Sequence, residues 1–171
     1  LVVLPFAFIR FFYAPWLEAQ LRLQAPRSLP NSTQGHVIIS RHDEIAAALI
    51  QRLGPAGIPH YVVESDPVVA TQLLTDGVDV IAGQLDERTT YEQLQLQQAR
   101  LLFANSGDTR NSNIALTARE VSDTVPIVGV VESEDSIDVL EFSGCTQVLP
   151  LKTRLGQYLA SRVSTGLGAV D

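Results

Sequence analysis

Short apolar runs alternate with amphipathic stretches along the chain from Pro30 onward. Runs that are nearly all apolar are typical of strands buried on both faces of a parallel sheet. They predict strands over residues 36–40, 59–65, 78–83, 99–106, 125–132 and 146–150. Apolar residues at helical spacing predict intervening helices over residues 43–53, 66–77, 88–98, 111–122, 136–144 and 154–163. This order predicts an α/β fold with a doubly wound, parallel, six-stranded sheet and helices on both faces.

The stretch from Asp66 to Gly77 carries the start and stop signals of a helix. Asp66 has the short carboxylate that suits an N-cap, and Pro67 suits the first helical position. Gly77 suits the end of the helix. Asp66 is therefore interpreted first as a cap and second as a binding residue.

The first residues have a different pattern. Leu1 to Ile9 is uniformly apolar, Arg10 interrupts the run, and apolar and aromatic residues continue to Leu17. Nine apolar residues are fewer than the roughly 20 that span a bilayer. We interpret residues 1–17 as the cytoplasmic end of a transmembrane helix, with the arginine and aromatic side chains at the membrane interface. The alternative is a strand or helix packed on the following domain.

Basic residues follow this apolar segment, which by the positive-inside rule places the rest of the chain on the cytoplasmic side of the membrane. Residues 18–34 are then expected to be a linker, residues 35–163 one compact domain, and residues 164–171 a tail. A length of 171 residues suits one domain with an appendage.

Charge and composition exclude several classes of function. Residues 1–30 carry a net charge of +2, which leaves −9 for residues 31–171 out of the total of −7. So acidic a surface argues against nucleic-acid binding, which needs clustered basic residues. The single cysteine, Cys145, excludes an internal disulfide, and the three histidines are not spaced as zinc ligands.

In doubly wound sheets, ligands bind beyond the carboxyl ends of the strands, at the point where the strand order reverses. The candidate binding residues follow the first four predicted strands, and they are Ser40, Arg41, His42, Asp43, Glu64, Asp66, Asp86 and Asn105. Glu64 is the strongest candidate, because an acidic side chain about 20 residues after the first turn can accept hydrogen bonds from ribose hydroxyls. The alternative is a solvated strand end.

Several phrases of the sequence carry a family resemblance. They are "HVIIS", "IPHYVVESDP", "LLTDGVDVIAG", "ARLLFANSGDTRNSNIALTAREV", "VPIVGVVES" and "FSGCTQVLPL". Together they resemble the RCK (KTN, TrkA-N) regulatory domain of potassium channels and transporters, over about residues 35–163. In many such channels the domain directly follows the inner helix of the pore, and residues 1–17 look like the end of that helix.

The resemblance implies a Rossmann-like fold that forms a homodimer, which in channels is often part of a larger ring. It also implies a membrane pore domain in the same polypeptide, a place at the cell membrane, and a role in potassium ion transport through conformational change. Late helices of the family pack against a partner subunit, which places Leu140 and Phe142 in an expected interface.

Nucleotide-binding members of this family have G-x-G-x-x-G in the first turn, where this chain reads "RHDEIA". Arg41, Asp43 and Ala46 occupy the three glycine positions. Arg41 must then adopt a tight turn suited to glycine, and the Asp43 carboxylate would repel a pyrophosphate. NAD is not expected in its usual pose, although Arg41 is a candidate contact for a phosphate in another pose.

The ligand itself stays open: NAD and adenine nucleotides are the candidates. Calcium is not expected, because the positions that match the calcium site of some channel members are Asn105, Val130 and Glu132, which supply one carboxylate. No pair of residues makes a convincing catalytic acid and base, so a binding and gating module is predicted in preference to an enzyme. The alternatives are a TrkA-N domain of a potassium transporter or antiporter and, more remotely, an NAD-dependent oxidoreductase.

Overall fold

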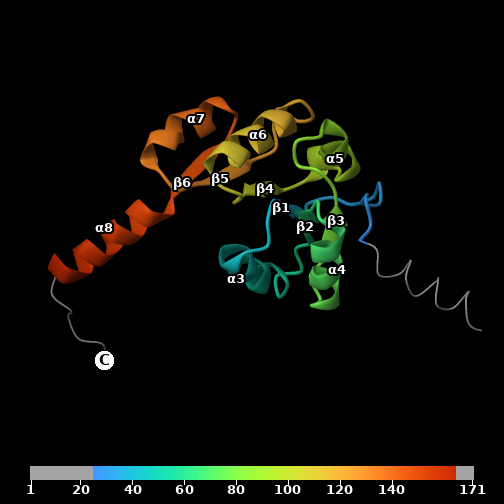
Figure 1. The fold of residues 1–171 in the computed structure, drawn as a ribbon, viewed down its shortest axis with the longest axis horizontal. Coiled ribbons are helices and arrows are strands. Elements are labelled where there is room, and N and C mark those ends of the chain that lie inside the picture. Colours follow the sequence, from blue (N-terminus) through green and yellow to red (C-terminus); the bar gives the residue numbers. More distant parts are fainter. Residues whose placement is uncertain (1–24, 165–171) are drawn as a thin grey trace, which may run out of the picture.

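The computed structural model describes residues 25–164, which form a six-stranded parallel sheet with helices on both faces (Figure 1). The strands are β1 (Val37–Ile39), β2 (His60–Glu64), β3 (Val80–Ala82), β4 (Leu101–Ala104), β5 (Ile127–Val131) and β6 (Gln147–Pro150). The helices are α3 (Glu44–Leu53), α4 (Pro67–Thr75), α5 (Arg88–Gln93), α6 (Asp108–Arg119), α7 (Ile137–Phe142) and α8 (Leu151–Ser164). The predicted fold class is confirmed.

The strand order is β3-β2-β1-β4-β5-β6, so the chain reverses its direction of travel across the sheet between β1 and β4. These two strands pair in parallel, with Ile39 opposite Phe103. The loops after β1 and β4 therefore diverge to opposite faces of the sheet. This divergence opens a crevice at their carboxyl ends, where ligands bind in such folds.

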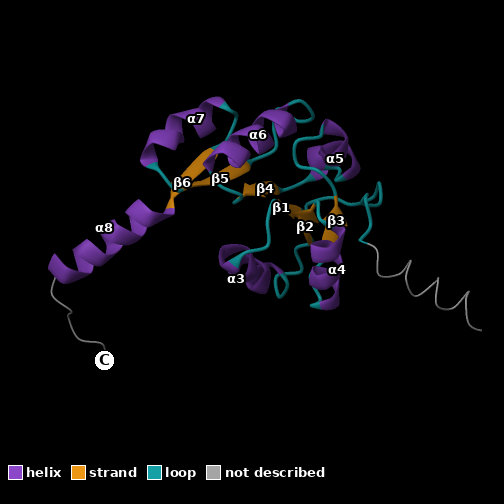
Figure 2. Cartoon of the chain, in the orientation of Figure 1, coloured by secondary structure: helices purple, strands orange, loops and turns teal. Residues whose placement is uncertain are grey.

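Helices lie on both faces of the sheet (Figure 2), and each face has its own core. On one face, β1 to β6 pack against α5, α6 and α7 around Ile38, Leu102 and Ile127, none of which is exposed. On the other face, Val37, Ile39 and Val62 pack against α3 and α4, among others. Adjacent residues of β1 thus contribute to opposite cores, as the near-continuous apolar strands predict.

The β6 end of the sheet is covered less completely. Figure 1 shows α3 and α4 beneath the β1–β3 part of the sheet, whereas α8 projects away from the end of β6. Val128 and Val130 of β5 are only partly buried on that side. No residue of α8 is buried.

Three predicted helices differ in detail from the observed ones. The helix expected over residues 88–98 ends early, because Gln95 has φ of 52° and separates α5 from a 3-10 helix at Leu96–Gln98. The helix expected at residue 111 begins three residues earlier, and the one expected at 154 begins at Leu151. Of the interface residues expected on α7, Leu140 is fully buried in the core, so its placement at an interface is wrong.

The last residues of the predicted linker pack on the domain. The amide of Ala82 donates to the carbonyl of Pro26 (2.7 Å), and Leu29 is buried in the core beside α5. The predicted membrane helix end at residues 1–17 and most of the 164–171 tail lie outside the described residues. Within residues 25–164, no helix is both long and apolar enough to cross a membrane.

Candidate functional site

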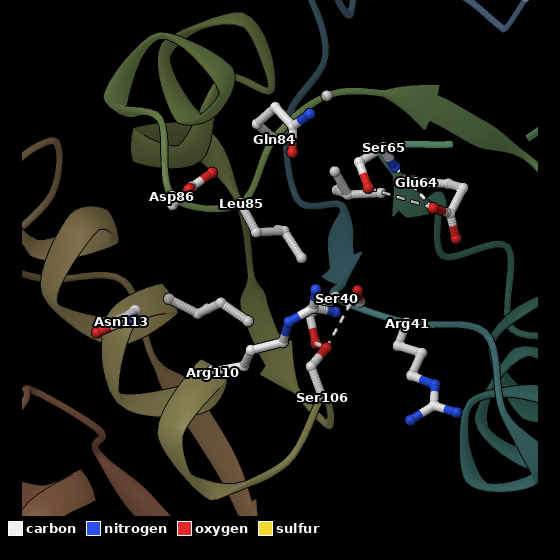
Figure 3. Close-up of a pocket in the computed structure, with 13 residues that line it drawn as sticks. Ser40, Arg41, Glu64, Ser65, Gln84, Leu85, Asp86, Ser106, Arg110 and Asn113 are labelled. Carbon is white, nitrogen blue, oxygen red and sulfur yellow. Dashed lines mark hydrogen bonds between the residues drawn. The ribbon is translucent and has the colours of Figure 1, made fainter. Parts of the chain in front are cut away.

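A cavity of about 280 Å³ lies at the carboxyl ends of β1 to β4, where the strand order reverses (Figure 3). Thirteen residues line it. They are Ser40, Arg41, Val63, Glu64, Ser65, Gly83, Gln84, Leu85, Asp86, Ser106, Arg110, Asn113 and Ile114. The lining combines apolar, hydroxyl, amide, acidic and basic side chains, which is the mixture expected of a small-molecule site.

Glu64 ends β2 and is held by the backbone of the next turn. Its Oε1 accepts hydrogen bonds from the amides of Ser65 (2.8 Å) and Asp66 (2.9 Å). Charge-assisted bonds of this kind fix the orientation of a carboxylate. Within the described residues its Oε2 has no hydrogen-bond partner, so this oxygen remains available to accept from a ligand hydroxyl.

Ser40, at the end of β1, belongs to a hydrogen-bond network with the β4 loop. Its Oγ accepts from the Asn105 amide (2.9 Å) and donates to Asn105 Oδ1 (3.1 Å), and Ser106 Oγ lies 2.9 Å away. Ser106 Oγ also donates to the Ser40 carbonyl (3.4 Å). Asn105 Nδ2 also donates to the Arg41 carbonyl (3.0 Å). Asn105 thus joins the two loops that diverge at the crevice.

The turn after β1 is built differently from a glycine loop. Asp43 is the N-cap of α3, and its Oδ1 accepts from the Ala46 amide at 2.8 Å. Gln95 is the only non-glycine residue within 25–164 with a positive φ, so Arg41 does not adopt a glycine-type conformation. The expectation of a glycine-like turn at Arg41 is therefore wrong, because the chain reaches α3 through ordinary backbone angles and an aspartate cap.

The turn after β3 is held from beneath by α5. Tyr91 is buried and donates its hydroxyl hydrogen bond to the Leu85 carbonyl (2.7 Å), and Thr90 packs against Gly83 so closely that a Cβ there would lie 2.7 Å from it. Burial, with the nearby Asp86 charge, raises the pKa of Tyr91 above its ordinary value of 10. Tyr91 is therefore a neutral hydrogen-bond donor that positions the Gln84–Asp86 segment of the cavity wall.

The start of α6 contributes three lining residues that the sequence prediction missed, Arg110, Asn113 and Ile114. Asn111, fully buried beside them, fixes this turn. Its Oδ1 accepts from the Ser106 amide (2.8 Å) and its Nδ2 donates to the Val130 carbonyl (2.7 Å). The sequence predicts that this helix begins at residue 111, so Arg110 is expected in a loop. The signal that could have identified Arg110 is a basic residue close to the start of a helix that follows a strand of the sheet.

The other acidic groups near this edge have structural partners. Asp108, in the first turn of α6, accepts from the amides of Glu132 (2.8 Å) and Ser133 (3.3 Å). Although partial burial opposes it, hydrogen bonding with Ser136 and these amides holds the pKa of Asp108 below its ordinary value. Within the described residues, no three His, Cys, Asp or Glu side chains form a group that could hold a metal ion.

Four of the eight predicted binding residues line the cavity, namely Ser40, Arg41, Glu64 and Asp86. The other four do not, and three of them have structural roles. Asp43 and Asp66 cap α3 and α4, and Asn105 connects the β1 and β4 loops. His42 is half-buried in the turn before α3. That these residues bind a ligand stays a prediction.

Comparisons with known proteins relate the chain to one domain family. The family model of the TrkA-N domain matches residues 37–150. No curated protein sequence matches the chain.

Among solved structures, the chain is similar to the GsuK channel bound to NAD, with 34% identity over 92% of this chain and 29% of that one, and a TM-score of 0.79. It is similar to GsuK bound to ADP, with 34% identity over 96% of this chain and 44% of that one, and a TM-score of 0.82. The chain thus spans less than half of the GsuK chains that it matches. The TrkA-N domain of the inner membrane protein ybaL from Escherichia coli shares the fold, at 17% identity over 76% of this chain and 97% of that one, with a TM-score of 0.68.

Proposed function

The chain belongs to the TrkA-N domain family and is related to the RCK domain of the GsuK potassium channel. We propose on this basis that it is the cytoplasmic regulatory domain of a potassium channel. The observation that carries the proposal is the 34% identity to a channel, extending over 92% of this chain. A regulatory domain acts by binding a ligand more tightly in one conformation than in another, which shifts the equilibrium of the attached pore.

The cavity at the end of the sheet supports an adenine nucleotide as the ligand. Val63, Leu85 and Ile114 supply an apolar surface for a base, and Glu64, which also lines the cavity, can accept hydrogen bonds from ribose hydroxyls. GsuK has been solved with NAD and with ADP.

A homodimer is supported by side chains that one chain leaves uncovered. On α6 and α7, Leu116, Val139 and Phe142 are exposed. A second set lies along α8 and comprises Leu155, Tyr158, Leu159 and Val163. Ile45 of α3 and Val68 and Val69 of α4 are exposed as well. Large exposed apolar groups on helices are typical of subunit contacts. Two separate surfaces on each chain suit a ring, in which every subunit has two neighbours.

The channel is favoured over a transporter or antiporter because the relationship at 34% identity is to a channel, whereas ybaL shares only the fold. The pore is proposed to lie in the same polypeptide, in the membrane, with this domain on the cytoplasmic side.

The ligand part of the proposal is tested by calorimetric titration of the purified domain with ATP, ADP, NAD, NADH and calcium chloride, with melting curves in parallel. At least one nucleotide should bind and raise the melting temperature, because a ligand that binds only the folded state stabilises it by mass action. Glu64→Gln should weaken binding about tenfold by removing a charged acceptor. Glu120→Gln, at an exposed position outside the cavity, is the matched control. A folded domain that binds no nucleotide would refute this part of the proposal.

A further inference from the structure

Arg110 is a cation in the cavity with no anion of its own. It lies in the first turn of α6, its side chain is exposed, and within residues 25–164 it forms no ion pair. In Figure 3 its side chain runs from α6 toward the end of β1, where Ser40 and Ser106 lie. Arg41, by contrast, points away from the centre of the view, toward α3. Arg110 is thus the basic group directed into the cavity.

The usual place for a phosphate in this type of fold is already taken. Phosphates commonly bind at the N-terminus of the helix after the first strand, where free amides and the helix dipole attract them. Here Asp43 caps that helix, with its Oδ1 at 2.8 Å from the Ala46 amide. A phosphate at this position would displace the cap and meet a like charge.

The charged groups of the cavity are divided between its two sides. Glu64 ends β2 and Asp86 lies in the loop after β3, whereas Arg110 comes from α6 after β4 (Figure 3). The fourth charged lining residue, Arg41, follows β1 and points toward α3. A ligand that fits this division has hydroxyl or amine donors at one end and an anion at the other. A nucleotide has both, with ribose hydroxyls for Glu64 and a phosphate for the guanidinium, which binds phosphate oxygens in a fork geometry.

We propose that Arg110 is the phosphate-binding residue of this site, and that the site prefers an adenine mononucleotide to a dinucleotide. This inference rests on the proposed nucleotide binding. One cation directed inward suits one phosphate group. A dinucleotide needs its bridging pyrophosphate near the start of α3, where the Asp43 carboxylate opposes it. The cavity volume of about 280 Å³ lies just below the usual range of ligand sites, which also favours a small ligand over a dinucleotide.

The test is a calorimetric series with adenosine, AMP, ADP and NAD at fixed ionic strength. Wild-type protein should bind AMP and ADP at least about tenfold more tightly than adenosine, because each phosphate contact to a guanidinium is a charge-assisted hydrogen bond. Arg110→Gln should remove this difference and leave adenosine binding unchanged. Arg110→Lys should keep part of it, because the charge remains. Asp43→Asn keeps a capping oxygen without the charge, and NAD affinity should rise several-fold.

Arg52→Gln is the matched control, because Arg52 is an exposed arginine in the last turn of α3 and does not line the cavity. Melting curves check that Arg110→Gln is folded, as expected for a side chain without an ion pair. If Arg110→Gln binds AMP as tightly as wild type, or NAD binds wild type more tightly than AMP and ADP do, this inference is overturned while the nucleotide site stands. If none of the four ligands binds wild type, the inference and the proposed ligand class both fail.

Discussion

The two halves of the sheet are covered by helices to different extents. In the β1–β3 half, α3 and α4 cover one face and α5 the other, and both helix starts on the covered face are capped by aspartates of the chain itself. In the β4–β6 half, α6 and α7 cover one face, whereas α8 projects away and buries no residue. Large apolar side chains are exposed in both halves, with Ile45, Val68 and Val69 on α3 and α4 and a larger set on α6, α7 and α8. The less covered β4–β6 half is where we propose the contact with another subunit.

The largest effect is expected from a charge placed on the less covered half. Phe142 of α7 is 92% exposed, so Phe142→Asp should leave the isolated chain folded and weaken the proposed dimer. Burying a phenylalanine is worth roughly 2 kcal/mol, and a two-fold interface buries two, so the dissociation constant should rise about a thousandfold. Sedimentation equilibrium measures it. A variant that stays fully dimeric would exclude this face from the interface.

Leu140, two positions before Phe142 on α7, should affect stability instead of association. Leu140 is fully buried, and a Cβ at Gly129 would lie 2.7 Å from it, so the helix and strand are in close contact there. Leu140→Ala should lower the free energy of unfolding by about 3 kcal/mol, since it leaves a cavity in the core. Urea unfolding of the monomeric Phe142→Asp background separates this effect from dimerisation. An unchanged unfolding midpoint would contradict the placement of Leu140 in the core.

The β1–β3 half contains a buried histidine that makes the stability of the domain depend on pH. His36 is fully buried, its Nε2 lies 2.8 Å from the Leu94 carbonyl, and its Nδ1 has no partner in the described structure. Desolvation, which outweighs the hydrogen bond to Leu94, lowers the pKa of His36 below its ordinary value of 6.5. The unfolded chain therefore takes up the proton first, and stability is lost as the pH falls below about 6.5, by at most about 1.4 kcal/mol per pH unit.

Chemical denaturation of wild type and His36→Gln between pH 5 and 8 checks this dependence. The substitution is expected to lower stability at neutral pH and to flatten the slope below about pH 6.5. Equal slopes in the two proteins would assign the pH dependence to other groups.

The smallest expected effect concerns the attachment of α8 to its own chain. Lys152 Nζ lies 3.6 Å from Glu132 Oε2, and the two side chains are 75% and 69% exposed. Exposed pairs of this kind contribute little, so Lys152→Gln should change the free energy of unfolding by no more than a few tenths of a kcal/mol. A loss above about 1 kcal/mol in thermal or urea unfolding would mean that α8 is held by its own domain more firmly than the exposed pair indicates.

The fold was largely predictable because its signals are local. Buried parallel strands read as apolar runs, and Asp66 with Pro67 marks the start of α4 as observed. Burial within a short helix was not predictable: Leu140 and Phe142 are both apolar and only two positions apart, and only the close approach to Gly129 decides which one faces the core.

The candidate site was predictable only in part, for a similar reason. Glu64 and Asp86 follow apolar strands, so the topology alone places them at the crevice. Arg110 was missed because the segment after β4 is polar and carries no apolar pattern that marks the start of α6, which follows Gly107 with a φ of 97°. Asp43 was expected to repel a phosphate, and the cap that it forms on α3 gives that expectation a structural basis.

The most direct test of the proposed regulatory role is single-channel recording of the full-length polypeptide in planar bilayers, with potassium as the permeant ion and ADP added on the side of this domain. We expect unitary potassium currents whose open probability changes with ADP, and an Arg110→Gln channel that needs about tenfold more ADP for the same change. Absence of potassium currents, or currents that do not respond to ADP at concentrations that saturate the purified domain, would contradict it.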